Sequence, residues 1–393
     1  MSPTQRKAVV AFAWLTAAYC VYGAFFTTYL PLWLKQQGLA VGVISSLMAI
    51  QPLTRVFVPY AWGALADKTH KRTQVLRWLS AMTLLCSLGL WWQGGAWWVA
   101  LVLLGIYAHF SAIQPLSDAA VSQVISQDGH LDSRLYGRIR LCGSVGFMLA
   151  VLFAGWWFER QGLQTFVWVV LVSAVLLLLA AMRTPTLYSS SAGQAPMPVA
   201  SVLRRQEVQW FFVGAFFHVL SHMGLYTFFS LYLDSLGYSK TMIGVYWSVS
   251  VTVEIAWFFT QSRWMPLLAL PQWLLLGSAV MAVRMAVTAE LATVLWVMVI
   301  AQAVHAFTFA AHHSAAMALI ARFFPGALLG RGQALYVVLA YGVPGMLAGF
   351  LGGWMQGYWG LSSIYWACSA SAAVAALCAW RIWCIHRSGA FFA

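Results

Sequence analysis

Long apolar runs of about twenty residues alternate with short polar stretches along the whole chain. These runs are continuous, as at 163–182 and 267–288, whereas transmembrane β-strands give alternating segments of about ten residues. Each run can cross a hydrocarbon core of about 30 Å as an α-helix. The pattern therefore predicts an all-α membrane protein with twelve transmembrane helices, over 8–34, 41–65, 73–92, 96–126, 137–159, 163–182, 206–233, 239–262, 267–288, 291–321, 329–355 and 360–384.

One polar stretch is much longer than the others and divides the predicted helices into two groups of six. It contains three consecutive serines at 189–191 together with Pro196 and Pro198, a composition typical of a flexible linker. We therefore predict three parts of the chain, an N-terminal six-helix bundle over 1–182, a cytoplasmic linker over 183–205 and a C-terminal six-helix bundle over 206–393.

A short internal repeat relates the two predicted bundles. The first predicted helix ends in YLPLWL over 29–34, followed by Gly38, and the seventh ends in FFSLYL over 228–233, followed by Gly237. The apolar run and the glycine both recur after 199 residues. Parallel repeats of this kind build carriers whose halves rock around a central site, although similar composition can also imitate so short a repeat by chance.

Composition agrees with this pattern and excludes a soluble protein. Only 8% of the residues are charged, against about 25% in soluble domains. The net charge is +13, yet on the side opposite the N-terminus we place only Lys35, Arg160 and Lys240. This bias predicts cytoplasmic termini and the lipid bilayer as a partner. No basic stretch is interleaved with exposed aromatics, so we expect no nucleic acid, and six cysteines without a CxxC pair predict no disulfide and no metal.

The loop between the second and third predicted helices holds the most specific string of the chain, GALADKTHKR over 63–72. It resembles the G-x-L-A-D-K/R-x-x-K/R-K/R signature of the major facilitator superfamily. In this interpretation Gly63 lets two helices approach closely, and Asp67 meets a cation or a helix N-terminus when the halves close. Lys71 and Arg72 hold the loop at the cytoplasmic face. We predict a conformational switch here; a simple positively charged loop is the alternative.

Four charged residues lie inside the predicted helices, Arg55, Asp118, Glu254 and Arg284, and Arg140 is a borderline fifth. Each costs at least about 2.5–3.5 kcal/mol at membrane depth, so each is a functional candidate. Glu254 has only apolar neighbours, and a carboxyl group in such surroundings can take up and release a proton near neutral pH. We predict that Glu254 couples transport to protons. A structural ion pair with Arg284 is the alternative.

Further polar residues extend this set. Asp118 either contacts substrate or is a structural partner of Arg140 or of the Asp67 loop. Arg55 and Arg284 suit a carboxylate or phosphate unless they pair with Asp118 and Glu254. Five histidines lie on the seventh and tenth predicted helices, and the seven-residue spacing of His305 and His312 predicts a shared face. We predict proton coupling by Glu254 and Asp118, and substrate binding by Arg55, Gln114, Asp118, Arg140, Glu254, Arg284 and His305.

Several strings resemble the phenylpropionate permease family, and the same pattern is similar to nucleoside–proton symporters and, more distantly, lactose permease. The strings are PLSDA over 115–119, YGRIRLCGSVGF over 136–147, HSAAM over 313–317 and GQALY over 332–336. Glu254 and Arg284 add to the resemblance. The resemblance covers essentially the whole chain. It implies the major facilitator fold and uptake by proton symport in a bacterial inner membrane, driven by the proton gradient without a cofactor. It also implies that the family keeps polar groups at the positions of Arg55, Asp118, Arg140, Glu254, Arg284 and His313, and on this ground we add His313 to the predicted proton-coupling residues.

The sequence leaves the substrate open. We expect a monomeric importer of a small organic solute, with an aromatic acid such as phenylpropionate favoured. A proton-driven exporter of lipophilic compounds and a nucleoside or sugar symporter are alternatives, although mid-membrane amides for sugars are few, at Gln51, Gln114 and Gln302. The chain has no H-E-x-x-H or G-x-S-x-G string, so we do not expect an enzyme.

Overall fold

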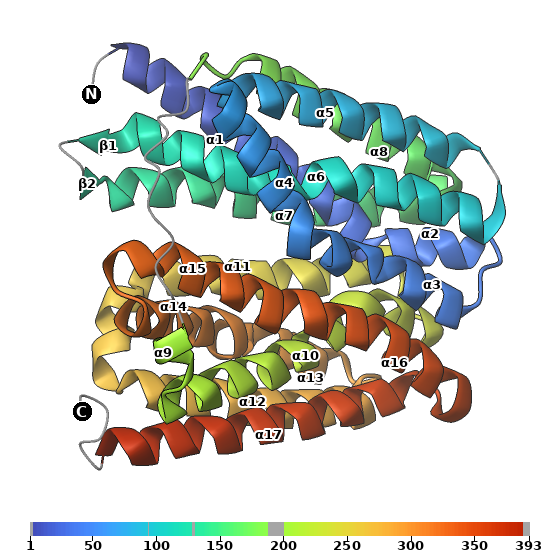
Figure 1. The fold of residues 1–393 in the computed structure, drawn as a ribbon. Helices are drawn as coiled ribbons and strands as arrows, with labels where there is room; N and C mark the ends of the chain where they lie inside the picture. The colour runs from blue at the N-terminus through green and yellow to red at the C-terminus, as the bar shows by residue number, and fades with distance from the viewer. Residues whose placement is uncertain (1–2, 93, 128–129, 188–199, 388–393) are drawn as a thin grey trace. The chain divides into compact units, whose positions relative to one another are not determined.

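The computed structural model describes residues 3–92, 94–127, 130–187 and 200–387, and the chain in these ranges is almost entirely helical (Figure 1). Eleven of the described helical segments are long and apolar enough to cross a membrane. The predicted third segment is α5 (Arg72–Leu88), which has 17 residues and is continued by the 3₁₀ turn η1 (Gly89–Trp91). That length lies at the short end of what spans a hydrocarbon core.

The helices gather into two compact units, which we describe separately. Unit 1 holds the elements up to α8 together with Ser239–Ser248 at the start of α11. Its elements are α1 (Pro3–Thr28), α2 (Leu30–Gln36), α3 (Val41–Met48), α4 (Ile50–Thr69), α5, η1, α6 (Gly95–Ile125), β1 (Ser126–Gln127), β2 (His130–Leu131), α7 (Ser133–Gln161), η2 (Leu163–Thr165) and α8 (Phe166–Met182). The two short strands pair in antiparallel fashion.

Unit 2 holds the remaining described elements. They are α9 (Ala200–Leu203), α10 (Gln206–Ser235), the rest of α11 (Lys240–Trp264), η3 (Met265–Leu267), α12 (Leu270–Leu291), α13 (Leu295–Ala303), η4 (Ala306–Ala311), α14 (His312–Phe323), η5 (Gly326–Leu328), α15 (Leu329–Tyr336), η6 (Val337–Gly342), α16 (Val343–Trp359) and α17 (Leu361–Arg387). The segments η4 and η6 are π-helical and interrupt the tenth and eleventh predicted helices. Most of the predicted linker, 188–199, lies outside the described residues.

Glycines permit a close helix contact in unit 1, between α1 and α7. A Cβ on Gly143 would meet Cys20 and Thr16, and one on Gly146 would lie 3.0 Å from the carbonyl oxygen of Ala17. Both glycines belong to the YGRIRLCGSVGF string, so part of that string is explained by packing. The expectation for Gly63 is wrong in this structure, because a Cβ added there would have nothing within 4 Å.

The predicted internal repeat is confirmed by the backbone. Gly38 and Gly237 both adopt left-handed conformations, with φ of 81° and 85°. In both copies the next residue closes the helix by an equivalent bond, from Leu39 N to Leu34 O at 3.2 Å and from Tyr238 N to Leu233 O at 3.1 Å. A side chain disfavours positive φ, so glycine is the residue that permits this ending.

Candidate functional site

The site in unit 2 is built around Arg284 of α12, which is buried with 2% of its surface exposed. Its Nη1 donates hydrogen bonds to Nδ1 of His305 and to Oγ1 of Thr308, both at 3.0 Å. Its Nη2 donates to Oε1 of Gln302 at 2.8 Å. All three partners come from the tenth predicted helix, so this one segment cradles the guanidinium group.

An irregular segment gives that helix its shape. Gln302 lies near the end of α13, His305 stands just before the π-helical η4, and Thr308 lies within it. A π-helix widens the backbone spiral and is found frequently at functional sites. The sequence pattern contains no sign of this insertion, and Thr308 was therefore missed among the candidate residues.

Glu254 of α11 does not pair with Arg284. Its Oε2 lies 3.9 Å from Nε2 of His305, on the side of the ring opposite Arg284. The alternative of a direct Glu254–Arg284 ion pair is therefore not found in the described structure, because the imidazole ring stands between the two charges. Ser250, one turn before Glu254, donates to Oε1 of Gln302 at 2.8 Å and ties α11 to the same cluster.

The direct partners of Arg284 are all neutral. In the described parts of the chain, no carboxylate lies within ion-pair distance of its guanidinium group. Arginine has five N–H donors and stays charged in proteins. Three are used here, which leaves Nε–H, buried without a partner among the described residues, and one hydrogen on Nη2. Such an edge can receive an anion in a two-bond contact.

The remaining histidines of unit 2 are divided between two faces. His305, Phe309 and His313 form a ladder of nearly parallel rings, with centroids 5.2 and 5.7 Å apart. His312 instead stacks on His218, with ring centroids 3.4 Å apart and an interplanar angle of 5°. The predicted shared face of His305 and His312 is therefore wrong. The π-helical turn shifts the register, so that the residue eight positions after His305 shares its face.

His218 is fixed by two hydrogen bonds. Its Nε2 lies 2.8 Å from the carbonyl oxygen of Thr308, and its Nδ1 lies 3.0 Å from Oγ of Ser278. Since a carbonyl oxygen only accepts, Nε2 carries the proton. His218 thus holds the π-helical segment that presents Thr308 to Arg284.

Unit 1 holds a second polar cluster around Asp118 of α6. Its Oδ1 accepts a hydrogen bond from Nε2 of Gln114 at 2.9 Å, and its Oδ2 lies 3.8 Å from Nη1 of Arg140 on α7. Tyr136 also bonds to this carboxylate. The structure thus brings together Gln114, Asp118 and Arg140. Arg55 on α4 makes no ion pair with Asp118 in the described chain.

The predicted switch residues lie at the end of α4. Nη2 of Arg72 donates to Oδ1 of Asp67 at 3.2 Å, and the Asp67 side chain is 57% exposed. His70, between them, ends the helix in a left-handed conformation with φ of 56° and donates its N–H to the Asp67 carbonyl oxygen. Arg72 is therefore a cation that Asp67 contacts in this structure.

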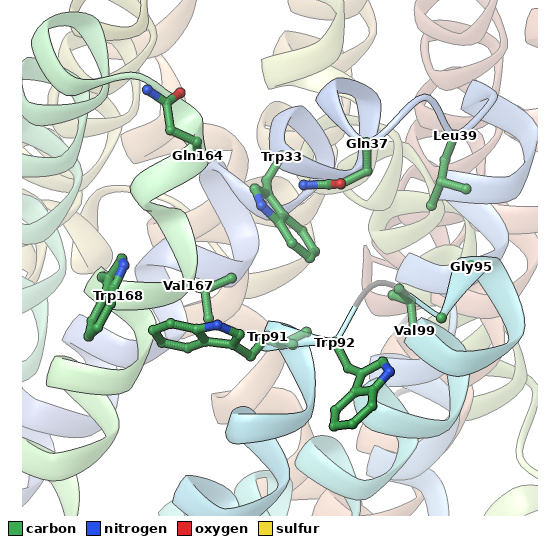
Figure 2. A pocket seen from close by; sticks show the side chains of 12 residues that line it. Trp33, Gln37, Leu39, Trp91, Trp92, Gly95, Val99, Gln164, Val167 and Trp168 are labelled. Carbon is green, nitrogen blue, oxygen red and sulfur yellow. The ribbon is translucent and has the colours of Figure 1, made fainter.

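A separate cavity of about 460 Å³ lies at the opposite end of unit 1 (Figure 2). Trp33, Trp91, Trp92 and Trp168 surround it together with Gln37 and Gln164, and its lining includes no charged residue. The edge of Trp91 packs against Trp168, and Trp92 is 75% exposed. Exposed tryptophans at helix ends are typical of the membrane–water interface. None of the predicted site residues lines this cavity.

Comparison with known proteins places the chain among transporters. Residues 12–367 match the MFS_1-like family. The chain is 26% identical to the probable 3-phenylpropionic acid transporter of Escherichia coli, over 86% of this chain and 90% of that protein. It is 27% identical to the maltose permease of Geobacillus stearothermophilus, over 88% and 87%. The crystal structure of the nucleoside transporter NupG superposes with a TM-score of 0.81 at 15% identity, over 97% and 99%.

These matches identify the class of protein. The fold is that of the major facilitator superfamily, and these relatives are membrane transporters rather than enzymes. The chain belongs to the MFS_1-like family and is a multi-pass membrane transporter.

Proposed function

We propose that this protein imports a small organic carboxylate together with protons by alternating access, with an aromatic acid favoured. It acts as a monomer in a bacterial inner membrane, with both termini in the cytoplasm, and the proton gradient drives it without a cofactor. The basic loops on the side of the N-terminus support this orientation.

The observation that carries the proposal is the buried Arg284 with its neutral partners. A charged group at membrane depth is costly and is kept there for a function. Arginine offers a planar fork that matches a carboxylate, and two of its N–H donors remain for one. A carboxylate on the substrate would supply the charge that the described chain does not place beside this group.

The surroundings of Arg284 favour an aromatic acid over a sugar. The ring of Phe309 lies one turn beyond His305, and His222 packs edge-on against it with centroids 6.1 Å apart. Oε1 of Gln302, the mid-membrane amide nearest to Arg284, already accepts bonds from Arg284 and Ser250, so its Nε2 is the one amide group left there in the described chain. A sugar site would need several amides and hydroxyls left for the substrate. The name of the Escherichia coli relative supports the same choice.

For the proton we propose Glu254, with His313 and Asp118 as further candidates. Glu254 is linked through His305 to Arg284, so a change at the anion site reaches it across one ring. His313 continues the ring ladder toward Tyr336, whose centroid lies 6.4 Å away. Asp118 is half-buried in unit 1 and paired with Arg140.

Proton movement in lightly buffered, right-side-out vesicles tests this proposal. We expect the external pH to rise when 3-phenylpropionate is added, and not when uridine or maltose is added. Vesicles without the protein set the baseline, because the neutral acid crosses a bilayer unaided. Glu254→Gln should abolish proton-driven accumulation while exchange partly remains. Absence of the wild-type signal would contradict symport, and protection of vesicles against lipophilic dyes would then favour the exporter.

A further inference from the structure

His305 is held between a cation and an anion in a way that fixes its protonation. Its Nδ1 lies 3.0 Å from Nη1 of Arg284, and its Nε2 lies 3.9 Å from Oε2 of Glu254. A guanidinium group only donates, so Nδ1 must accept with its lone pair. The ring is then neutral and carries its one proton on Nε2, toward Glu254. While Arg284 stays in place, His305 has no lone pair left for a second proton.

We propose that Arg284 gates a proton site on His305, and that a bound carboxylate opens it. This inference rests on the proposed function. A carboxylate that draws the guanidinium group toward itself breaks the bond from Nη1 to Nδ1. The freed lone pair of Nδ1 then takes up one proton, and the imidazolium ring donates from Nε2 to the Glu254 carboxylate. Loss of the carboxylate to the cytoplasm returns Arg284 to His305 and expels the proton.

The charges of the site balance at each step. In the unloaded state Arg284 carries +1, His305 is neutral and an ionised Glu254 carries −1, so the three groups sum to zero. A carboxylate entering alone would leave a net charge of −1 in a buried cluster. One proton on His305 restores neutrality, and unbalanced charge at membrane depth is strongly disfavoured. The site therefore binds one proton with each carboxylate.

Few other groups can take up the proton in place of His305. The titratable or charged groups that face its ring in the described chain are Arg284 from α12, Glu254 from α11 and His222 from α10. The His222 ring centroid lies 5.8 Å away and its Nδ1 faces the carbonyl oxygen of His218 at 3.4 Å. The tenth predicted helix, which carries His305, places Phe309 against the ring, and phenylalanine does not titrate.

The pH dependence of binding tests the proposal. We expect the Kd of purified protein for 3-phenylpropionate to rise about tenfold per pH unit through neutral pH, because one proton binds with each anion. His305→Asn keeps an acceptor for Arg284 but cannot be protonated. It should bind the acid with a Kd independent of pH, and it should still exchange labelled for unlabelled acid, which shows that it is folded.

Two further variants complete the design. His109→Asn removes a membrane-embedded histidine of α6 in unit 1, bonded to the Gly105 carbonyl oxygen, and should keep the wild-type slope. Glu254, which stays ionised in this inference, is the main rival proton site, and a wild-type slope in His305→Asn would leave the proton there and overturn this inference. His313→Asn tests a second rival site, and loss of the slope in His313→Asn alone would assign the proton to His313. A flat wild-type profile would instead contradict the proposed symport itself.

Discussion

Replacing Arg284 gives a direct measure of what the anion site contributes. Arg284→Gln removes the charge and the two donors that remain for a substrate, Nε–H and one hydrogen on Nη2. Hydrogen bonds to charged groups contribute about 1.5–3 kcal/mol each. Loss of both should weaken carboxylate binding by about 3–6 kcal/mol, or roughly 10²–10⁴-fold in Kd. Arg284→Lys keeps the positive charge but loses the planar pair of N–H donors, so we expect carboxylate binding to weaken by roughly 10–10²-fold in Kd.

The fold should survive these changes. Gln302 keeps the hydrogen bond from Ser250 at 2.8 Å, and Thr308 remains fixed through its carbonyl oxygen by His218. Exchange of labelled substrate at high concentration and thermal unfolding both report whether the variants are folded. Arg263→Gln removes the same charge from an exposed position at the end of α11 and serves as the matched control.

Titration calorimetry with 3-phenylpropionate and its neutral amide, 3-phenylpropionamide, separates two roles of Arg284. If Arg284 binds the carboxylate, only the acid loses affinity in Arg284→Gln. Equal losses for acid and amide would show that Arg284 acts by holding the tenth helix in place. Unchanged acid binding would refute the anion site altogether, and Arg55→Gln measured in parallel would then report on the arginine of unit 1.

Two smaller changes test other parts of the molecule. Asp67→Asn breaks an exposed pair with Arg72, worth about 0–1 kcal/mol, so Tm and Kd should hardly change while the transport rate falls; an unaltered rate would remove the switch role. Gly146→Val places a Cβ 3.0 Å from the Ala17 carbonyl oxygen, so overpacking should lower stability by about 1–3 kcal/mol in thermal unfolding. Gly137→Val, on the same helix with nothing within 4 Å, is its control, and equal Tm values would contradict the packing argument.

The parts of the fold that follow from local rules were predictable. Helix length follows from the hydrocarbon thickness, and the positive φ of Gly38 and Gly237 follows from the need to end two equivalent helices. The repeat extends to Gly162 and Gly360, with φ of 79° and 76°, which the sequence comparison missed. The sequence carries the same correspondence, because GWWFERQGL over 155–163 and GWMQGYWGL over 353–361 share Gly-Trp at their start and Gly-Leu at their end.

The partners within the site were not predictable in the same way. Arg284 and Glu254 were identified because charges inside apolar runs are rare. Whether they pair directly stayed open, because the sequence does not show what lies between charges on two neighbouring helices. The π-helical η4 turns His305 between them and Thr308 toward Arg284. One inserted residue in a helical turn leaves no mark in composition, so a regular helical spacing also placed His312 on the wrong face.

The two units neutralise their buried charges in different ways, and this difference bears on where an anion binds. In unit 1 the Asp118 carboxylate contacts Arg140 and also accepts from Gln114, so its charge has a direct counter-charge. In unit 2 an imidazole ring separates Arg284 from Glu254. An anion that approaches Asp118 meets a like charge. An anion that approaches Arg284 meets a cation with two N–H donors that the described chain does not use. Because the ring between Arg284 and Glu254 can itself be protonated, the arrangement that attracts the anion also supplies the place for its proton.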